Sequence, residues 1–311
     1  MWLTYSVFAA LCFGLRGILY HWTSQKPINR NLLLCGTFSM GAIVNGLCAL
    51  AFSSNWTLSA LIGIQMGLFS FGANASMFKG FAVGKASLVA ILTALPSVVV
   101  VIIAYGLWGE KLHAMQLVAF LVIVGGALLV RLSNDISLQN LQGAQWGLIA
   151  MLLFAANDLS GKWSTIKEAE LFPTMFFMFV TGAICFGVWW LRDLQKELAK
   201  RVAAAAGQAG GEVLVSLHST DVEGRAGAVW SAKRTFLAGL AIGTTNAFGM
   251  MLIVTAFDLG KAGLVSAVTA LNVLIVLLYT RFVVKEKFTK IEITGIALAF
   301  IGILLMRLFG G

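Results

Sequence analysis

Two charged side chains stand within apolar segments of the sequence, where a charge is costly. Arg16 falls inside the apolar stretch 2–21, and Asp158 is the one carboxylate well inside such a stretch, at 144–162. A guanidinium donates two parallel hydrogen bonds to a carboxylate, and a carboxylate in turn accepts hydrogen bonds from an ammonium group. If both side chains face a common cavity, they could hold the two ends of a zwitterion such as an amino acid.

Each of these charges also has an interpretation that involves no zwitterion. Arg16 could extend its charged end to the membrane surface. Asp158 could pair with Lys162, which lies one helical turn further along the chain. Asp158 could also couple transport to protons, because a carboxylate removed from water can exchange its proton for cargo. An ion pair with Arg16 or Lys162 would hold the carboxylate ionised and would prevent that last role.

Uncharged polar side chains inside the apolar segments complete the candidate substrate-binding set. These are Asn74, Thr93, Asn157, Asn246, Thr269 and Asn272, within a wider polar group that includes Asn45, Thr244 and Thr245. Such residues also join neighbouring helices by hydrogen bonds, without any role in binding. Pro96 removes one backbone hydrogen bond from its helix, and the freed carbonyl either bends the span or faces the cavity.

The composition sets the class of protein that must position these residues. Hydrophobic residues make up 59% of the 311 positions and charged residues 11%. Ten segments are long and apolar enough to cross a bilayer as helices. They lie near residues 2–21, 32–53, 58–79, 86–107, 113–131, 144–162, 171–191, 235–256, 262–284 and 290–308. Runs such as 98–104 do not alternate as β-barrel strands do. We expect an all-α membrane protein with ten transmembrane helices.

The sequence contains one unit twice. Residues 84–132 reappear without a gap at 260–308, an offset of 176, and earlier positions such as Phe13 and Phe154 match at an offset of 141. A long match at a fixed offset indicates duplication. We therefore assign a first repeat at 1–132 and a second at 146–308. The difference of 176 − 141 = 35 residues predicts a polar insertion at about 192–234 in the second repeat.

Each repeat is predicted to have five spans. Because five is an odd number, the second repeat should cross the membrane in the opposite sense to the first. Inverted repeats of this kind place a solute site near the bilayer midplane, where the two halves meet.

The duplicated segment resembles a known repeat. The stretch from Ala86 through Pro96 to Gly109–Glu110–Lys111 and Gly125–Gly126, with its second copy, is similar to the repeat of EamA-type transporters of the drug/metabolite transporter superfamily. The resemblance covers nearly the whole chain apart from the insertion. It implies a fold of ten helices in two repeats, and transport of small solutes. The second copy has Asn272 in place of Pro96, which leaves open whether the ninth span is broken.

Two further sets of residues have predicted structural roles. Glu110 and Glu286 occupy equivalent helix junctions, where a carboxylate can cap the next helix at the positive end of its dipole. A gating salt bridge is the alternative. The small residues Gly125, Gly126 and Gly302 should let helices approach closely, either within the chain or in a homodimer.

The insertion begins with a helical pattern. Apolar residues recur at helical spacing among basic ones, namely Leu191, Leu194, Leu198 and Val202 among Arg192, Lys196, Lys200 and Arg201. This pattern predicts a helix that lies on an anionic membrane surface. The Gly-rich stretch beyond 203–206 predicts a poorly ordered loop.

The remaining sequence features separate the classes of function. The net charge of +9 belongs to loops beside the membrane and does not indicate nucleic-acid binding. The three histidines are scattered, and there is neither an HExxH motif nor a nucleophile with its base, so we expect no enzyme, metal or cofactor. We predict a secondary transporter in the cell membrane that moves a small polar metabolite by alternating access. The alternatives are a channel and a membrane sensor or scaffold.

Overall fold

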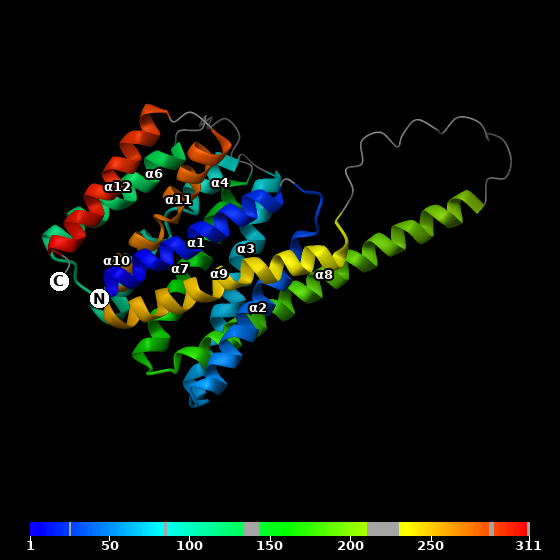
Figure 1. Ribbon diagram of the computed structural model, residues 1–311, viewed down its shortest axis with the longest axis horizontal. Helices are drawn as coiled ribbons and strands as arrows, with labels where there is room; N and C mark the ends of the chain where they lie inside the picture. The colour runs from blue at the N-terminus through cyan, green and yellow to red at the C-terminus, as the bar shows by residue number, and fades with distance from the viewer. Residues whose placement is uncertain (25, 84–85, 133–142, 210–229, 286–288, 310–311) are drawn as a thin grey trace.

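The computed structural model describes residues 1–24, 26–83, 86–132, 143–209, 230–285 and 289–309, and in these ranges it contains helices and no strand. This confirms the predicted all-α class. The order of elements is α1 (Trp2–Ser24), α2 (Arg30–Ala51), the 3-10 turn η1 (Leu58–Leu61), α3 (Ile62–Val83), α4 (Ala86–Leu92), α5 (Pro96–Trp108), α6 (Ala114–Leu132), α7 (Ala144–Ile166), α8 (Leu171–Ala209), α9 (Ala232–Leu259), α10 (Ala262–Thr269), α11 (Asn272–Tyr279), the π-helical turn η2 (Thr280–Val284) and α12 (Lys290–Phe309) (Figure 1).

Eight helical segments of the described chain are long and apolar enough to cross a membrane. Each of the ten predicted segments is helical, but α6 and α7 do not meet this criterion. The apolar part of α6 is shorter, at Ala114–Val130. Helix α7 carries polar and charged residues that include Asn157, Asp158 and Lys162. The structure therefore supports a helical protein with at least eight candidate spans, and the count of ten stays a prediction.

The fourth and ninth predicted spans are both divided in two. In the first repeat, α4 ends at Leu92 and α5 begins at Pro96. In the second repeat, α10 ends at Thr269 and α11 begins at Asn272, although no proline is present there. The break therefore occurs at the same place in both copies, and proline is not required for it. Ends of broken helices leave backbone groups available to a cavity.

Equivalent helices of the two repeats pack against each other reciprocally. The ring of Phe38 on α2 covers Gly182 on α8, while the ring of Phe179 on α8 covers Gly41 on α2. Phe38 and Phe179 are themselves in contact, with ring centroids 5.7 Å apart. Both Phe38 and Gly41 match their counterparts at the offset of 141. Residue numbers increase along α2 in the direction in which the contacting residue numbers of α8 decrease. These two helices therefore run antiparallel.

The last helices of the repeats, α6 and α12, pack in the same way. A methyl group added to Gly126 would lie 2.7 Å from the backbone N of Ala299, and one added to Gly302 would lie 2.5 Å from the side chain of Ile123. Gly126 and Gly302 are thus packing residues, as predicted, and their contacts lie within one chain. A methyl group added to Gly125 would meet no atom of the described residues within 4 Å, so its predicted packing role is wrong within this part of the chain.

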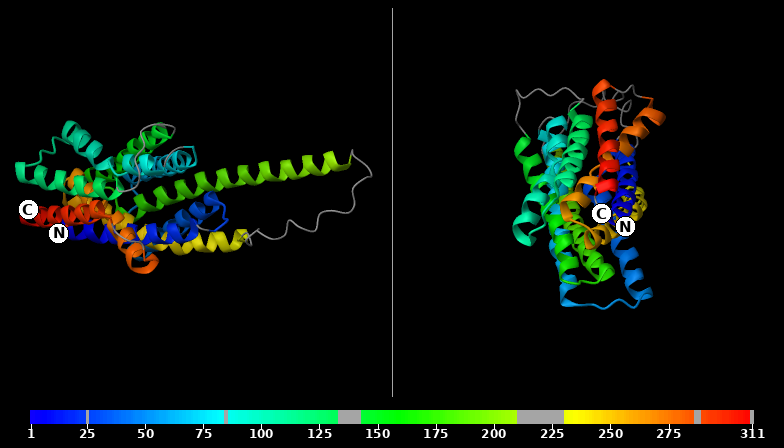
Figure 2. Two further views of the ribbon diagram at one scale, coloured as in Figure 1. Left: turned by 90° about the horizontal axis from the view of Figure 1, so that it is seen from above. Right: turned by 90° about the vertical axis from the view of Figure 1, so that its left-hand side faces the viewer.

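Helix α8 is longer than the other helices and extends beyond them. Its 39 residues run from Leu171 to Ala209 as one helix, and its C-terminal part is straight and projects away from the other helices (Figures 1 and 2). The prediction of a helix lying on the membrane surface is therefore wrong, because residues 192–209 continue the axis of the preceding apolar segment. Residues 210–229 lie outside the described part of the chain, and the predicted loop there stays a prediction.

The neighbouring glycines of α6 provide a matched test of this packing. We expect Gly126→Leu to lower the free energy of unfolding by about 1–3 kcal/mol, because the new side chain would overpack against the α12 backbone. Gly125→Leu should leave stability nearly unchanged, since that position faces open space. Equilibrium unfolding in mixed detergent micelles measures both effects, and an equal loss in the two variants would contradict the assignment.

Candidate functional site

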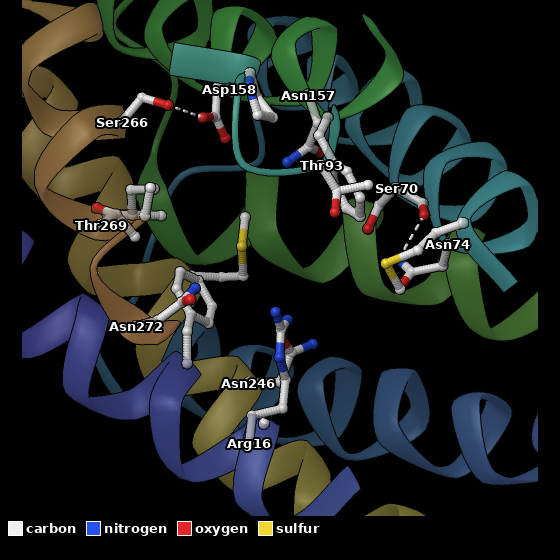
Figure 3. A pocket seen from close by; sticks show the side chains of 18 of the residues that line it. Arg16, Ser70, Asn74, Thr93, Asn157, Asp158, Asn246, Ser266, Thr269 and Asn272 are labelled. Atoms are coloured by element: carbon white, nitrogen blue, oxygen red, sulfur yellow. Dashed lines mark hydrogen bonds between the residues drawn. The ribbon is translucent and has the colours of Figure 1, made fainter. Parts of the chain in front are cut away.

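A cavity of about 290 Å³ lies among α1, α3, α7, α9 and the two broken spans. All eight predicted substrate-binding residues line it: Arg16, Asn74, Thr93, Asn157, Asp158, Asn246, Thr269 and Asn272 (Figure 3). Pro96 lines it as well. The structure thus brings together residues from both halves of the sequence, and their role in binding stays a prediction.

Arg16 projects from α1 into this cavity (Figure 3). Its Nη1 donates a hydrogen bond to Oδ1 of Asn246 on α9. The guanidinium carbon also lies 4.6 Å from the ring centroid of Phe13 and 5.9 Å from that of Tyr20, distances at which aromatic rings attract a cation. The alternative in which Arg16 extends to the membrane surface is therefore wrong.

Asp158 lies on the opposite wall, on α7 (Figure 3). Its Oδ2 accepts a hydrogen bond of 2.6 Å from Ser266 Oγ on α10. Of the described residues, no Lys, Arg or His side chain lies within ion-pairing distance of it. Lys162 does not pair with Asp158 as one prediction had it. Instead, Lys162 Nζ donates to the carbonyl oxygens of Phe257, at 2.6 Å, and Gly260, at 2.9 Å.

The uncharged members of the set differ in how well their hydrogen bonds are satisfied. Asn74, Thr93 and Thr269 each donate to a carbonyl one turn back in their own helix. In contrast, the buried Oδ1 of Asn157 and Oγ of Ser97 have no hydrogen-bond partner within the part of the chain that the structure describes. A buried acceptor without a donor costs about 1–3 kcal/mol. A solute or water in the cavity could supply donors to these atoms.

Several cavity residues were absent from the sequence prediction. They are chiefly Ser70, Ser97 and Ser266, together with Tyr20 and apolar side chains such as Phe154. A signal for Ser266 was present, because it lies three residues before Thr269 and so shares a helix face with it. Serines are common helix-packing residues in membranes, so this signal alone was weak.

Glu110 joins the two halves of the protein. Its Oε2 accepts a hydrogen bond of 2.8 Å from the backbone N of Ala262, at the start of α10. Its Oε1 lies 3.5 Å from Lys162 Nζ, and the two side chains are only 14% and 13% exposed. The prediction that Glu110 caps the following helix is wrong, because it caps a helix of the second repeat. The ion pair that was the alternative is present, and its role as a gate stays a prediction.

The helices that follow these junctions are capped by other residues. Oε1 of Gln116 accepts from the backbone N of His113 at the start of α6. Thr289 and Glu292 accept from each other's backbone N at the start of α12, the reciprocal arrangement known as a capping box. These two sites are equivalent at the offset of 176. Glu286 lies outside the described residues, so its predicted capping role stays a prediction.

A sequence model of the EamA-like transporter family matches residues 1–132 and 141–308. The chain belongs to this family. It is accordingly a membrane transporter of the drug/metabolite transporter superfamily, and a multi-pass protein of the cell membrane. The family match and the eight long apolar helices thus confirm the resemblance drawn from the repeat.

Comparison with solved structures supports the fold of this EamA-family chain. A structure titled "Crystal structure of protein" is similar with a TM-score of 0.69 at 15% sequence identity, over 99% of this chain and 97% of the other. At that identity the likeness concerns the fold alone. No curated protein matches the chain. Among the described residues, no group of three or more His, Cys, Asp or Glu side chains is placed to hold a metal ion.

A double-mutant cycle tests the contact between Glu110 and Lys162. We expect Glu110→Gln and Lys162→Met each to lower stability, because each leaves a mostly buried charge without its partner. The double variant should lose less than the sum of the two, with a coupling of about 0.5–3 kcal/mol. Unfolding in mixed micelles gives the values, and Lys111→Met, which removes an exposed charge beside Glu110, is the control. If the stability loss of the double variant equals the sum of the two single losses, the two side chains do not interact.

Proposed function

We propose that this transporter binds a small zwitterionic metabolite, such as an amino acid, between Arg16 and Asp158, and carries it by alternating access. One observation carries the proposal. A cation from α1 and an anion from α7 line the same cavity, and no described residue forms an ion pair with either. Charges removed from bulk water are costly unless they are compensated. A solute with one carboxylate and one ammonium group would compensate both.

The neighbours of each charge suit the end of the solute that it would hold. Asn246 anchors one Nη of Arg16, which leaves other guanidinium N–H groups to donate to a carboxylate. At the other wall, Asp158 and Asn157 both line the cavity, and Oδ1 of Asn157 has no hydrogen-bond partner among the described residues. An ammonium group has three donors, so it could satisfy the Asp158 carboxylate and the Asn157 amide oxygen together.

The size and lining of the cavity favour a small, partly apolar solute. About 290 Å³ lies at the lower end of the range for small-molecule sites. Phe13, Phe154 and Met250 contribute apolar surface beside the polar groups, which would suit a solute that carries an aliphatic or aromatic side chain. A simple anion or cation would leave one of the two protein charges uncompensated.

The helix packing supports alternating access. The equivalent helices α2 and α8 run antiparallel and exchange reciprocal contacts, as do α6 and α12. This arrangement is the one expected of inverted repeats, whose relative rocking exposes a central site to each side in turn. Both broken spans border the cavity, as in other transporters with inverted repeats.

A second role for Asp158 is favoured by its single hydrogen bond. Because Ser266 is its partner and no described cation holds it ionised, the carboxylate could take up a proton during the cycle. The two roles make opposite predictions for Asp158→Asn. If Asp158 binds the ammonium group, the variant should lose both net uptake and the exchange of solute across the membrane without a proton gradient. If it only couples protons, that exchange should persist while dependence on the gradient disappears.

Uptake of neutral amino acids into proteoliposomes tests the binding proposal. We expect Arg16→Gln and Asp158→Asn each to lower uptake at least tenfold, because each removes a charge-assisted hydrogen bond of about 1.5–3 kcal/mol. Arg16→Lys should be intermediate, since it keeps the charge and loses the planar fork. Arg30→Gln is the control, because Arg30 lies at the start of α2, outside the cavity lining. Unchanged flux in both cavity variants would refute the proposal.

A further inference from the structure

The projecting part of α8 carries exposed apolar side chains. The 18 residues from Arg192 to Ala209 would extend about 27 Å at the rise of an α-helix. Within α8, Leu191 is 49% exposed, Leu198 52% and Val202 68%. Apolar surface of this kind on a helix that projects beyond its neighbours favours a partner that covers it.

Five exposed apolar residues and one exposed glutamine of α8 follow a heptad repeat. Ile184, Val188, Leu191, Gln195, Leu198 and Val202 are separated by 4, 3, 4, 3 and 4 residues, and all six are exposed. We call this row the α8 seam. The gaps of four and three residues alternate strictly, so positions 184, 191 and 198 and positions 188, 195 and 202 each recur every seven residues. This heptad pattern is typical of helices that wind around each other in a left-handed coiled coil.

The projecting part of the α8 seam lies on the side of α8 opposite to α2. Asp193 lies about half a turn round the helix from the seam, and its Oδ2 accepts a hydrogen bond of 2.6 Å from Asn31 Nδ2 at the start of α2. Helix α2 therefore occupies the opposite side of α8. Among the residues that the structure describes, none buries the seam side chains from Leu191 to Val202, so this part is open to a partner outside the chain.

The residue types along the seam specify the partner. Assigned to heptad positions, Val188 and Val202 occupy a, while Ile184, Leu191 and Leu198 occupy d. A β-branched residue at a with leucine at d favours a parallel pair of helices. Gln195 is the one polar residue at an a position, and a single polar residue there fixes register and the number of strands at some cost in stability.

We propose that the α8 seam binds the α8 seam of a second copy of this chain, forming a parallel homodimer. Two copies inserted in the same orientation have parallel α8 helices, and a two-fold axis along the membrane normal places each seam residue opposite its own counterpart. Confinement to one membrane raises the effective concentration of the copies, so a seam of about three heptads suffices. The proposal is independent of the cargo and of the cavity.

Disulfide crosslinking in liposomes tests the contact. We expect full-length Leu198→Cys, reconstituted alone and oxidised, to give a disulfide-linked dimer. Glu197→Cys, which lies away from the seam, should give no more crosslinking than the wild-type protein with its four native cysteines. If the two variants crosslink equally, or if neither exceeds the wild type, the proposal is overturned. If the cysteine at position 198 forms a crosslink only in whole-cell membranes, and not in liposomes of the pure protein, the partner is a different protein. That result would also overturn the proposal.

Two seam substitutions, at Gln195 and at Leu198, should change the strength of the dimer in opposite directions. In energy-transfer measurements between labelled copies in liposomes, Gln195→Ile should tighten the dimer about tenfold, because it replaces a buried polar group by an apolar one. Leu198→Gln should weaken it by a similar factor. Lys196→Ile introduces the same side chain beside the seam and should leave the association unchanged. If Gln195→Ile and Lys196→Ile have the same effect, the association is unspecific and the proposal fails.

Discussion

The cost of placing charge in an apolar slab governs the arrangement of this protein. Three charged residues lie within helices α1 and α7, and each is compensated to a different extent. Lys162 has a carboxylate and two carbonyl oxygens, whereas Arg16 has one amide oxygen and two aromatic rings. Asp158 has one hydroxyl. The charge with full compensation serves as a structural contact, and the two with partial compensation are the ones that line the cavity.

Helices α7 and α10 connect the cavity with the contact at Glu110. On α7, Asp158 and Lys162 are one turn apart, and on α10 the backbone N of Ala262 and the hydroxyl of Ser266 are also one turn apart. Each helix thus presents one group to the cavity and one to the ion pair. An ammonium group that drew Asp158 away from Ser266 would loosen the helix pair that the Glu110–Lys162 contact holds together. In the proposed function, occupation of the site would therefore be coupled to the contacts at Glu110.

Much of the cavity could be predicted from sequence, because polar residues in long apolar segments are forced toward the interior of the bundle. That argument places Arg16, Asp158 and the asparagines without any knowledge of which helices touch. It fails where the partner is remote in sequence. Glu110 looks like a local helix cap, and only the fold brings it to Ala262, 152 residues away.

Two other features depend on the assembled fold in the same way. The ninth span breaks at Asn272 without a proline, so the break comes from the shared architecture of the repeats and not from a local signal. The apolar period of residues 191–202 correctly predicts a helix. It says nothing of direction, and the course of α8 follows from its continuity with the preceding segment. Local patterns therefore define elements, while the partners of their ends are set by packing.

The duplication leaves a symmetric scaffold around an asymmetric site. Reciprocal contacts such as Phe38 with Gly182 and Phe179 with Gly41 hold equivalent helices in equivalent places. In the cavity, however, Arg16 of the first repeat corresponds to Asn157 of the second, and both line the same space. A perfectly symmetric cavity would offer the same group from both halves and could not distinguish the two ends of a solute. The first half supplies Arg16 where the second has Asn157, and the second half supplies Asp158 where the first has Gly17. For the proposed solute with two different ends, the divergence of these two adjacent repeat positions would be enough to set one favourable orientation.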